Sequence, residues 1–186
     1  MPINIGEEIV AAYLQHIKGC EFIQQNLYTP DAQGEMDVVG IDLETRTIYV
    51  CEVAIHLVTG LQYVKDSQPN NINKLTEKFS KDIEYTNKYF PDYIKHFMLW
   101  TPIVKVSGDK AKYNQLADIE KITENIRNKF GVTLECIINE HFSRCLAELR
   151  EFARHETKDL KSPVLRFLQV EEYLKKHLTS ISKIAR

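Results

Sequence analysis

Closely spaced cysteines, long apolar runs and an excess of basic residues are all missing from this chain of 186 residues. Its four cysteines lie far apart and form no Cys-x-x-Cys pair, which excludes the spacing of a zinc knuckle and predicts no disulfide framework. No apolar run approaches the ~20 residues that a membrane-spanning helix needs. Because no basic region precedes an apolar segment at the start, we expect no signal peptide, no membrane partner and a cytoplasmic location.

Several functional motifs are missing as well. The sequence has no Walker-type glycine-rich loop, no dinucleotide-binding fingerprint and no Gly-x-Ser-x-Gly nucleophile elbow. We therefore expect no nucleotide cofactor and no acyl transfer of the serine-hydrolase kind. A dedicated non-specific nucleic-acid binder would usually be basic, whereas the formal net charge here is -2. Any contact with DNA must therefore use a local patch of positive charge.

What the sequence does contain is an interleaved pattern of helices and strands. Apolar residues at helical spacing predict helices over 5–18, 72–90 and 114–130. Short apolar runs predict strands over 21–28, 35–42, 47–56, 96–104 and 132–138. From Glu140 onward the sequence predicts helix, with a break at Ser162-Pro163. The order αβββαβαβ followed by helices predicts an α/β fold in which helices flank a mixed central sheet.

The length and the 44% hydrophobic content suit a single domain with a sizeable core. Within it we expect residues 1–140 to form the α/β core and residues 141–186 a C-terminal helical extension. Apolar residues of the extension predict packing on the core or on a second copy of the chain, namely Val164, Leu165, Phe167, Leu168, Val170, Tyr173 and Leu174. Its basic residues fit either a surface that follows a phosphate backbone or a plain solvated helix face.

The most informative stretch is the predicted hairpin from Gly34 to Ala54, because carboxylates lie inside its apolar runs. Asp37 and Glu52 are each bracketed by apolar residues, and a desolvated charge needs a partner. Side chains alternate along a strand, so pairing of the two strands can bring both acids to one face. Two carboxylates, a backbone carbonyl and water molecules are a normal ligand set for Mg²⁺. The alternative is that both acids lie at strand ends in contact with solvent.

Three short motifs occur in order along these elements. Residues 6–14 read GEEIVAAYL on the first helix, residues 34–37 read GEMD, and residues 50–54 read VCEVA. Together with the order of elements, they resemble the PD-(D/E)xK nuclease superfamily, which has the restriction-endonuclease-like fold. The resemblance is closest to its small bacterial endonuclease-like branch and to the archaeal Holliday-junction resolvases. It covers about residues 5–105, and the following helix and strand to residue 138 more weakly.

The resemblance implies a metal-dependent DNA endonuclease that hydrolyses phosphodiester bonds, with Mg²⁺ or Mn²⁺ as cofactor, DNA as partner and a homodimer as one assembly known for this fold. Asp37 and Glu52 would hold the metal together with the carbonyl of Val53. Glu7 would orient a water or an ion from the first helix, although an acid in the first helical turn is favourable by itself. Glu35 is either an accessory residue or a solvated neighbour.

The sequence departs from the family at Ala54, where the family has a lysine that positions the attacking water. A lysine from another element can replace it, as is known within the superfamily, and we prefer Lys74, with Lys78 and loop Lys65 as accessory candidates. Alternatively, His56 can substitute as base or water-positioner. In a third explanation the site is degenerate, and the domain only binds nucleic acid or assembles with partners.

Overall fold

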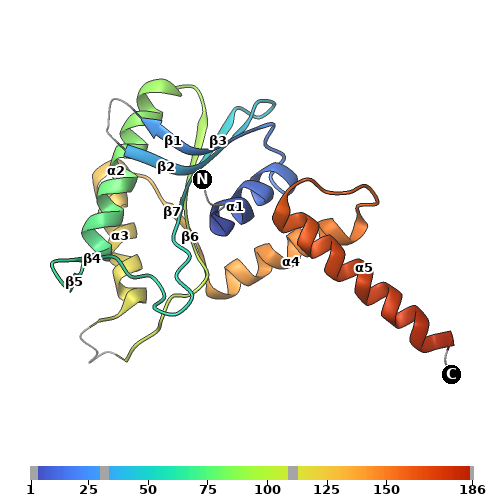
Figure 1. Ribbon diagram of the computed structural model, residues 1–186. Helices are drawn as coiled ribbons and strands as arrows, with labels where there is room; N and C mark the ends of the chain where they lie inside the picture. The colour runs from blue at the N-terminus through green and yellow to red at the C-terminus, as the bar shows by residue number, and fades with distance from the viewer. Residues whose placement is uncertain (1–3, 30–33, 109–112, 185–186) are drawn as a thin grey trace.

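The computed structural model describes residues 4–29, 34–108 and 113–184, and places a mixed sheet between two layers of helices (Figure 1). The elements in chain order are α1 (Ile5–His16), β1 (Phe22–Thr29), β2 (Gly34–Asp42), β3 (Thr47–Val53), β4 (Val64–Lys65), β5 (Gln68–Pro69), α2 (Asn71–Tyr89), β6 (Ile94–Thr101), α3 (Gln115–Phe130), β7 (Leu134–Ile138), α4 (Asn139–His155) and α5 (Pro163–Ile184). The predicted order is confirmed, with the short pair β4–β5 added in the loop after β3.

The five-stranded sheet has the order β1-β2-β3-β6-β7. The pairs β1–β2 and β2–β3 are antiparallel, whereas β3–β6 and β6–β7 are parallel. Parallel neighbours need a crossover connection, and α2 and α3 provide the two crossovers. Because such crossovers are almost always right-handed and both step in the same direction across the sheet, α2 and α3 cover the same face. The predicted mixed central sheet flanked by helices is therefore confirmed.

Each face of the sheet has its own hydrophobic core. On one face, α1 and α4 pack against the sheet around Trp100, with Leu14 and Phe142 in contact with this cluster. On the other face, α2 and α3 pack around Val50 and Leu99. Helix α5 lies outside these layers and contacts α4 and α1 (Figure 1). Asp37 and Glu52 thus lie on strands that are covered from both sides.

The helix ends follow their sequence signals with one exception. Asn4 begins α1 by accepting a hydrogen bond from the Gly6 nitrogen at 3.1 Å, and Gly131 ends α3 in the left-handed conformation with φ 70°. Asn70 occupies the N-cap of α2, but no capping bond from its side chain is found in the described chain. The Asn71 side chain instead accepts from the Tyr63 nitrogen at 2.7 Å, so it holds the preceding loop.

The boundaries of the hairpin differ slightly from the prediction. Strand β3 ends at Val53 rather than at residue 56, so His56 belongs to the following loop. The predicted break at Ser162-Pro163 separates α4 from α5, and Pro163 is the first residue of α5. The sequence also predicts turns at Pro30, Asp31 and Gly34 and at Ser107-Gly108-Asp109. Of these residues, Pro30, Asp31 and Asp109 lie outside the described ranges. No helix in the described ranges is long and apolar enough to cross a membrane.

Gly6 fixes the contact between α1 and the end of β3. A Cβ atom on Gly6 would overlap the Ile55 side chain and approach Val53 Cγ1 to 3.0 Å.

In a helix, alanine is normally more stable than glycine by about 1 kcal/mol. Here we expect Gly6→Ala to destabilise the protein by about 1–2 kcal/mol, because the overlap forces α1 away from the strand. Urea unfolding measures this change. Gln15→Ala, at an exposed position of the same helix, should stay within about 0.5 kcal/mol of the wild type. An increase in stability of Gly6→Ala would contradict the close packing.

Candidate functional site

The two acids of the hairpin converge on one lysine of α2. Val38 pairs with Cys51 and Val39 with Val50, and continuing this register sets Asp37 opposite Glu52. The Lys78 ammonium lies 3.1 Å from Oδ1 of Asp37 and also forms an ion pair with Oε2 of Glu52. The structure therefore brings Lys78, rather than Lys74 one helical turn earlier, to both carboxylates.

A distortion of β1 accompanies the turn of Asp37 toward α2. Asn26 lies between the residues of β1 that pair with Val38 and Met36, so it faces Asp37 across the strands, and it has φ 51°. Regular alternation is also interrupted in β2, since Met36 packs on the α2 side and Val38 on the α1 side. The Val53 nitrogen donates to Oδ2 of Asp37 at 2.7 Å. Asp37 therefore joins the end of β3 to the lysine of α2.

Glu52 is buried to 1% exposure, and within the described chain its Oε1 atom has no hydrogen-bond partner. Burial raises the pKa of this carboxyl well above its ordinary value, and the charge of Asp37 raises it further, while the Lys78 ammonium opposes both effects. Burial alone would lower the pKa of Lys78, but the charges of Glu52 and Asp37 outweigh it and raise the pKa. Lys78 therefore stays an ammonium at neutral pH.

Asp82, one turn after Lys78, brings a third acid into this cluster. It is 4% exposed, and its Oδ2 atom lacks a hydrogen-bond partner among the described residues. Burial raises the pKa of Asp82 to about 7, although the neighbouring Glu52 carboxyl and the charges of Lys78 and Lys81 lower it in part. Lys78 forms ion pairs with Asp37 and Glu52 only, so the buried carboxyl of Asp82 needs a proton or a cation for full compensation.

The loop after β3 supplies an aromatic wall beside the cluster. Burial raises the pKa of Tyr63, which Lys78 lowers and Glu52 and Asp37 raise, so these charges act on the phenol. His56 is exposed and meets the Tyr63 ring edge-on, with 6.0 Å between the ring centroids. Ala54 is buried at 2% and packs in the core beneath α2. The position of the family lysine is therefore an apolar core position here.

A polar cleft of 220 Å³ opens next to Lys78 and Asp82. Its lining residues come from β2 and α2 and are Gly34, Glu35, Lys74, Glu77, Lys78, Lys81 and Asp82. Glu35 is exposed at its rim. Lys65 of β4 is exposed, and its positive charge helps to lower the pKa of Glu77, after the larger effect of Lys81. Lys74 and Lys65 thus belong to the surroundings of the cleft rather than to the carboxylate cluster.

Glu7 lies on α1 and reaches β1 rather than Lys78. Its side chain is largely buried, accepts from the Asn26 side chain at 2.8 Å and also accepts from the side chain of Asn4. Because Asn26 faces Asp37 across the strands, Glu7 bonds to the distorted part of β1 that adjoins the site. This position is compatible with support of the backbone around Asp37.

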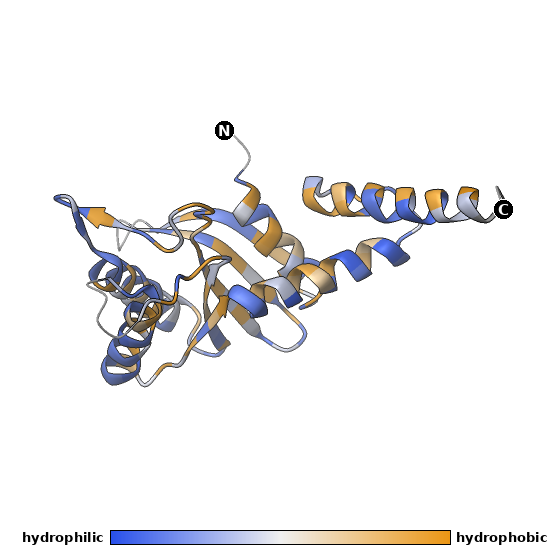
Figure 2. Cartoon of the chain, turned by 90° about the horizontal axis from the view of Figure 1, so that it is seen from below, coloured by the Kyte–Doolittle hydropathy of each residue, from blue (hydrophilic) through white to orange (hydrophobic). Residues whose placement is uncertain are grey.

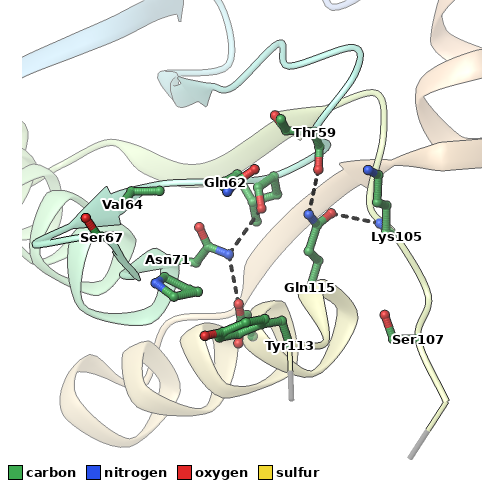
Figure 3. A pocket seen from close by; sticks show the side chains of 12 residues that line it. Thr59, Gln62, Val64, Ser67, Asn71, Lys105, Ser107, Tyr113 and Gln115 are labelled. Atoms are coloured by element: carbon green, nitrogen blue, oxygen red, sulfur yellow. Dashed lines mark hydrogen bonds between the residues drawn. The ribbon is translucent and has the colours of Figure 1, made fainter. Parts of the chain in front are cut away.

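A larger pocket of 350 Å³ lies where the loop after β3 meets α3 (Figure 3). Its polar side chains bond to one another and to the backbone. Asn71 donates to the Leu61 carbonyl at 3.1 Å and to Asp118 at 2.8 Å, and Gln115 donates to the Thr59 carbonyl at 2.8 Å. These bonds hold the segment that carries Tyr63, so we assign this pocket a structural role and place the candidate site at the carboxylate cluster.

The sequence contained a signal for Asp82 that the periodicity argument did not use. Asp82 follows Leu75 by seven residues and precedes Ile83, so it lies in the middle of the apolar face of α2. An acid at such a position needs a partner in the core. Lys78, three residues after Leu75, borders the same face, and its charge acts on Asp82.

Comparisons with known proteins give no match for this chain, whether with protein-family models, with curated proteins or with solved structures. Among residues 4–29, 34–108 and 113–184, no group of three or more His, Cys, Asp or Glu side chains is arranged so that it could hold a metal ion. The arrangement of Asp37, Glu52, Asp82 and Lys78 is therefore the observation on which a function must be argued.

The buried acids predict a specific pH dependence in the presence of EDTA. A carboxyl whose pKa rises on folding costs stability as the pH increases from its unfolded value, about 4, to its folded value, about 7 for Asp82. Asp82→Asn removes this cost, and its amide can donate to Glu52. We expect the stability of the variant relative to the wild type to rise by about 1.4 kcal/mol per pH unit between pH 4 and pH 7, about 4 kcal/mol in all, and to level off above pH 7. Urea unfolding at several pH values measures the difference. The exposed control Asp92→Asn should show no such trend, and a pH-independent difference for Asp82→Asn would contradict the buried charge cluster.

Proposed function

We propose that this chain is a metal-dependent nuclease of the restriction-endonuclease-like fold that hydrolyses phosphodiester bonds of DNA. The observation that carries the proposal is the Lys78 ammonium placed against both Asp37 and Glu52. These are the residue types that the resemblance requires, and the lysine comes from α2 instead of from position 54. The α/β fold with a mixed sheet is compatible with this assignment.

The acids fit a divalent cation by charge and by ligand chemistry. Oε1 of Glu52 and Oδ2 of Asp82 are buried and lack hydrogen-bond partners within the described ranges, while Lys78 pairs with Asp37 and Glu52 only. Mg²⁺ and Mn²⁺ prefer oxygen ligands, and Mg²⁺ commonly keeps several waters beside one or two carboxylates. Asp37 and Glu52 would hold the ion, with the Val53 carbonyl as a third donor. When bound, the ion would neutralise charge on the phosphate and lower the pKa of an attacking water.

Side chains around the ion would contribute to catalysis and to DNA binding. Lys78 would stabilise the negative charge that develops on the phosphate and orient the attacking water. Asp37 would also hold the end of β3 through the Val53 nitrogen. The cleft beside the site adds Lys74 and Lys81, which would attract the phosphate backbone of a DNA strand without reading its sequence.

A second candidate function is nucleic-acid binding without cleavage. It is favoured by Ala54 and by the ion pairs that Lys78 makes with both acids, because a lysine can compensate buried carboxylates in place of a metal. The two candidates differ in one measurable property: only the nuclease needs a divalent cation at these acids.

A comparison of Lys78 with Lys74 tests the proposed nuclease activity. Lys78→Ala should lower the rate of Mg²⁺-dependent DNA cleavage by about 10²–10⁴-fold, since it removes charge stabilisation at the reacting phosphate. Lys74→Ala is the matched control on the same helix and should change the rate by less than about tenfold, because Lys74 lines only the cleft. Cleavage of a supercoiled plasmid and of a labelled branched duplex measures both rates. Equal rates for wild type and Lys78→Ala would contradict the assigned role of Lys78.

Metal binding is tested separately from activity. Mn²⁺ should raise the thermal midpoint of the wild type by several degrees, since an ion that binds only the folded state stabilises it. Asp37→Ala should abolish both this shift and cleavage, whereas the exposed control Asp92→Asn should keep both. If the protein binds DNA but shows neither a change of its thermal midpoint with Mn²⁺ nor cleavage, the result would favour the second candidate and contradict the first.

A further inference from the structure

Helix α5 presents an apolar stripe that nothing in the described chain covers. Its inner side packs on the rest of the protein through Leu165 and Leu168, which are buried, and Arg150 of α4 forms ion pairs with Glu171 and Glu172. The rest of α5 extends away from the layers of the fold (Figure 1). Hydrophobic positions recur along its length (Figure 2).

The stripe consists of five residues that are each between 48% and 70% exposed: Phe167, Val170, Leu174, Leu178 and Ile181. At 100° per residue, all five lie within roughly 40° of the direction of Leu174. Leu165 and Glu172 lie on the opposite side of the helix by the same count, which is the side toward α4. The stripe is about 21 Å long at 1.5 Å per residue. Monomeric proteins rarely expose an apolar surface that is so continuous.

The stripe is symmetric about its centre. The intervals between successive members are three, four, four and three residues, so the spacing reads the same in both directions from Leu174. Two copies that pair in antiparallel orientation would set Leu174 against its own copy, Val170 against Leu178, and Phe167 against Ile181. Each large side chain then meets an apolar partner. A self-complementary patch of this kind is what a two-fold symmetric interface needs.

Charge at one edge of the stripe supports the same arrangement. Glu171 and Lys175 flank Leu174 on one side of the helix, and they form an ion pair at 3.1 Å within the chain. In the antiparallel pair, that edge of one helix lies beside the same edge of the other, which brings Glu171 near the Lys175 of the second copy. Opposite charges at such flanking positions set partner choice and orientation in helix pairs.

We propose that two copies of this chain form an antiparallel homodimer through α5, with Leu174 at the two-fold axis. The proposal rests on α5 alone and is independent of the function of the carboxylate cluster. Because α5 already packs on α4, the helix is formed before association and loses little conformational entropy on pairing.

The oligomeric state of the full chain tests the proposal. Sedimentation velocity over a concentration range of about two orders of magnitude should show a monomer–dimer equilibrium, because the fraction of dimer rises with protein concentration. Leu174→Asp should weaken association at least tenfold, whereas Thr179→Asp, off the stripe on the same exposed helix, should leave it unchanged. Circular dichroism establishes that both variants remain folded. A wild type that stays monomeric throughout, or a Leu174→Asp variant that associates equally well, would overturn the proposal.

Disulfide trapping tests the orientation. Val170→Cys and Leu178→Cys proteins, mixed and oxidised, should form the mixed disulfide, because a disulfide requires Cα atoms within about 7 Å. Val170→Cys alone should not link to itself, since two residues 170 would lie about 12 Å apart along an antiparallel pair. Efficient linkage of Val170→Cys to itself would indicate a parallel pair and overturn the proposed register.

Discussion

Compensation of buried negative charge between Lys78 and the two hairpin acids is the interaction on which the site depends. Glu52 is almost fully buried, and an unpaired carboxylate there would cost several kcal/mol. Its ion pair with Lys78 offsets part of this cost and ties α2 to β3. Asp37 extends the link to β2, while Asp82 leaves the cluster with more negative than positive charge. A structural ion pair would not need that excess, but a site that exchanges a proton for a cation would.

The fold determines why these groups meet. The β2–β3 hairpin places Asp37 opposite Glu52, and the crossover from β3 to β6 lays α2 over the same face of the sheet. Asn26 has a distorted backbone, and its side chain donates to Glu7 of α1; it lies on β1, the third element around Asp37. Each of these elements packs into one of the two cores, so the site is supported from both faces of the sheet. The stripe of α5 lies elsewhere, and its exposure needs a separate explanation.

Sequence patterns were sufficient for the order of elements and for the acids of the hairpin. Strand alternation predicted that Asp37 and Glu52 could share a face, although β2 departs from it at Met36, and helical spacing predicted the apolar side of α2. They were insufficient to choose between Lys74 and Lys78, because both border that side and the choice depends on how far α2 lies along β3. The spacing of Asp82 from Leu75 places it in the core, but helical spacing alone does not show that it meets the acids of the hairpin. The exposed side of α5 could not be known either, since the apolar residues of this helix point in two directions and only packing on α4 shows which of them are covered.

The most direct test of the account is the anomalous scattering of Mn²⁺ in a crystal of the wild-type protein grown with that ion. The account predicts a peak roughly 2–2.5 Å from carboxylate oxygens of both Asp37 and Glu52, with the Lys78 ammonium displaced from the ion. A crystal with Mn²⁺ at other surface sites, but with the ion pairs of Lys78 to both acids intact and no peak between them, would contradict the central claim that these carboxylates form a metal site.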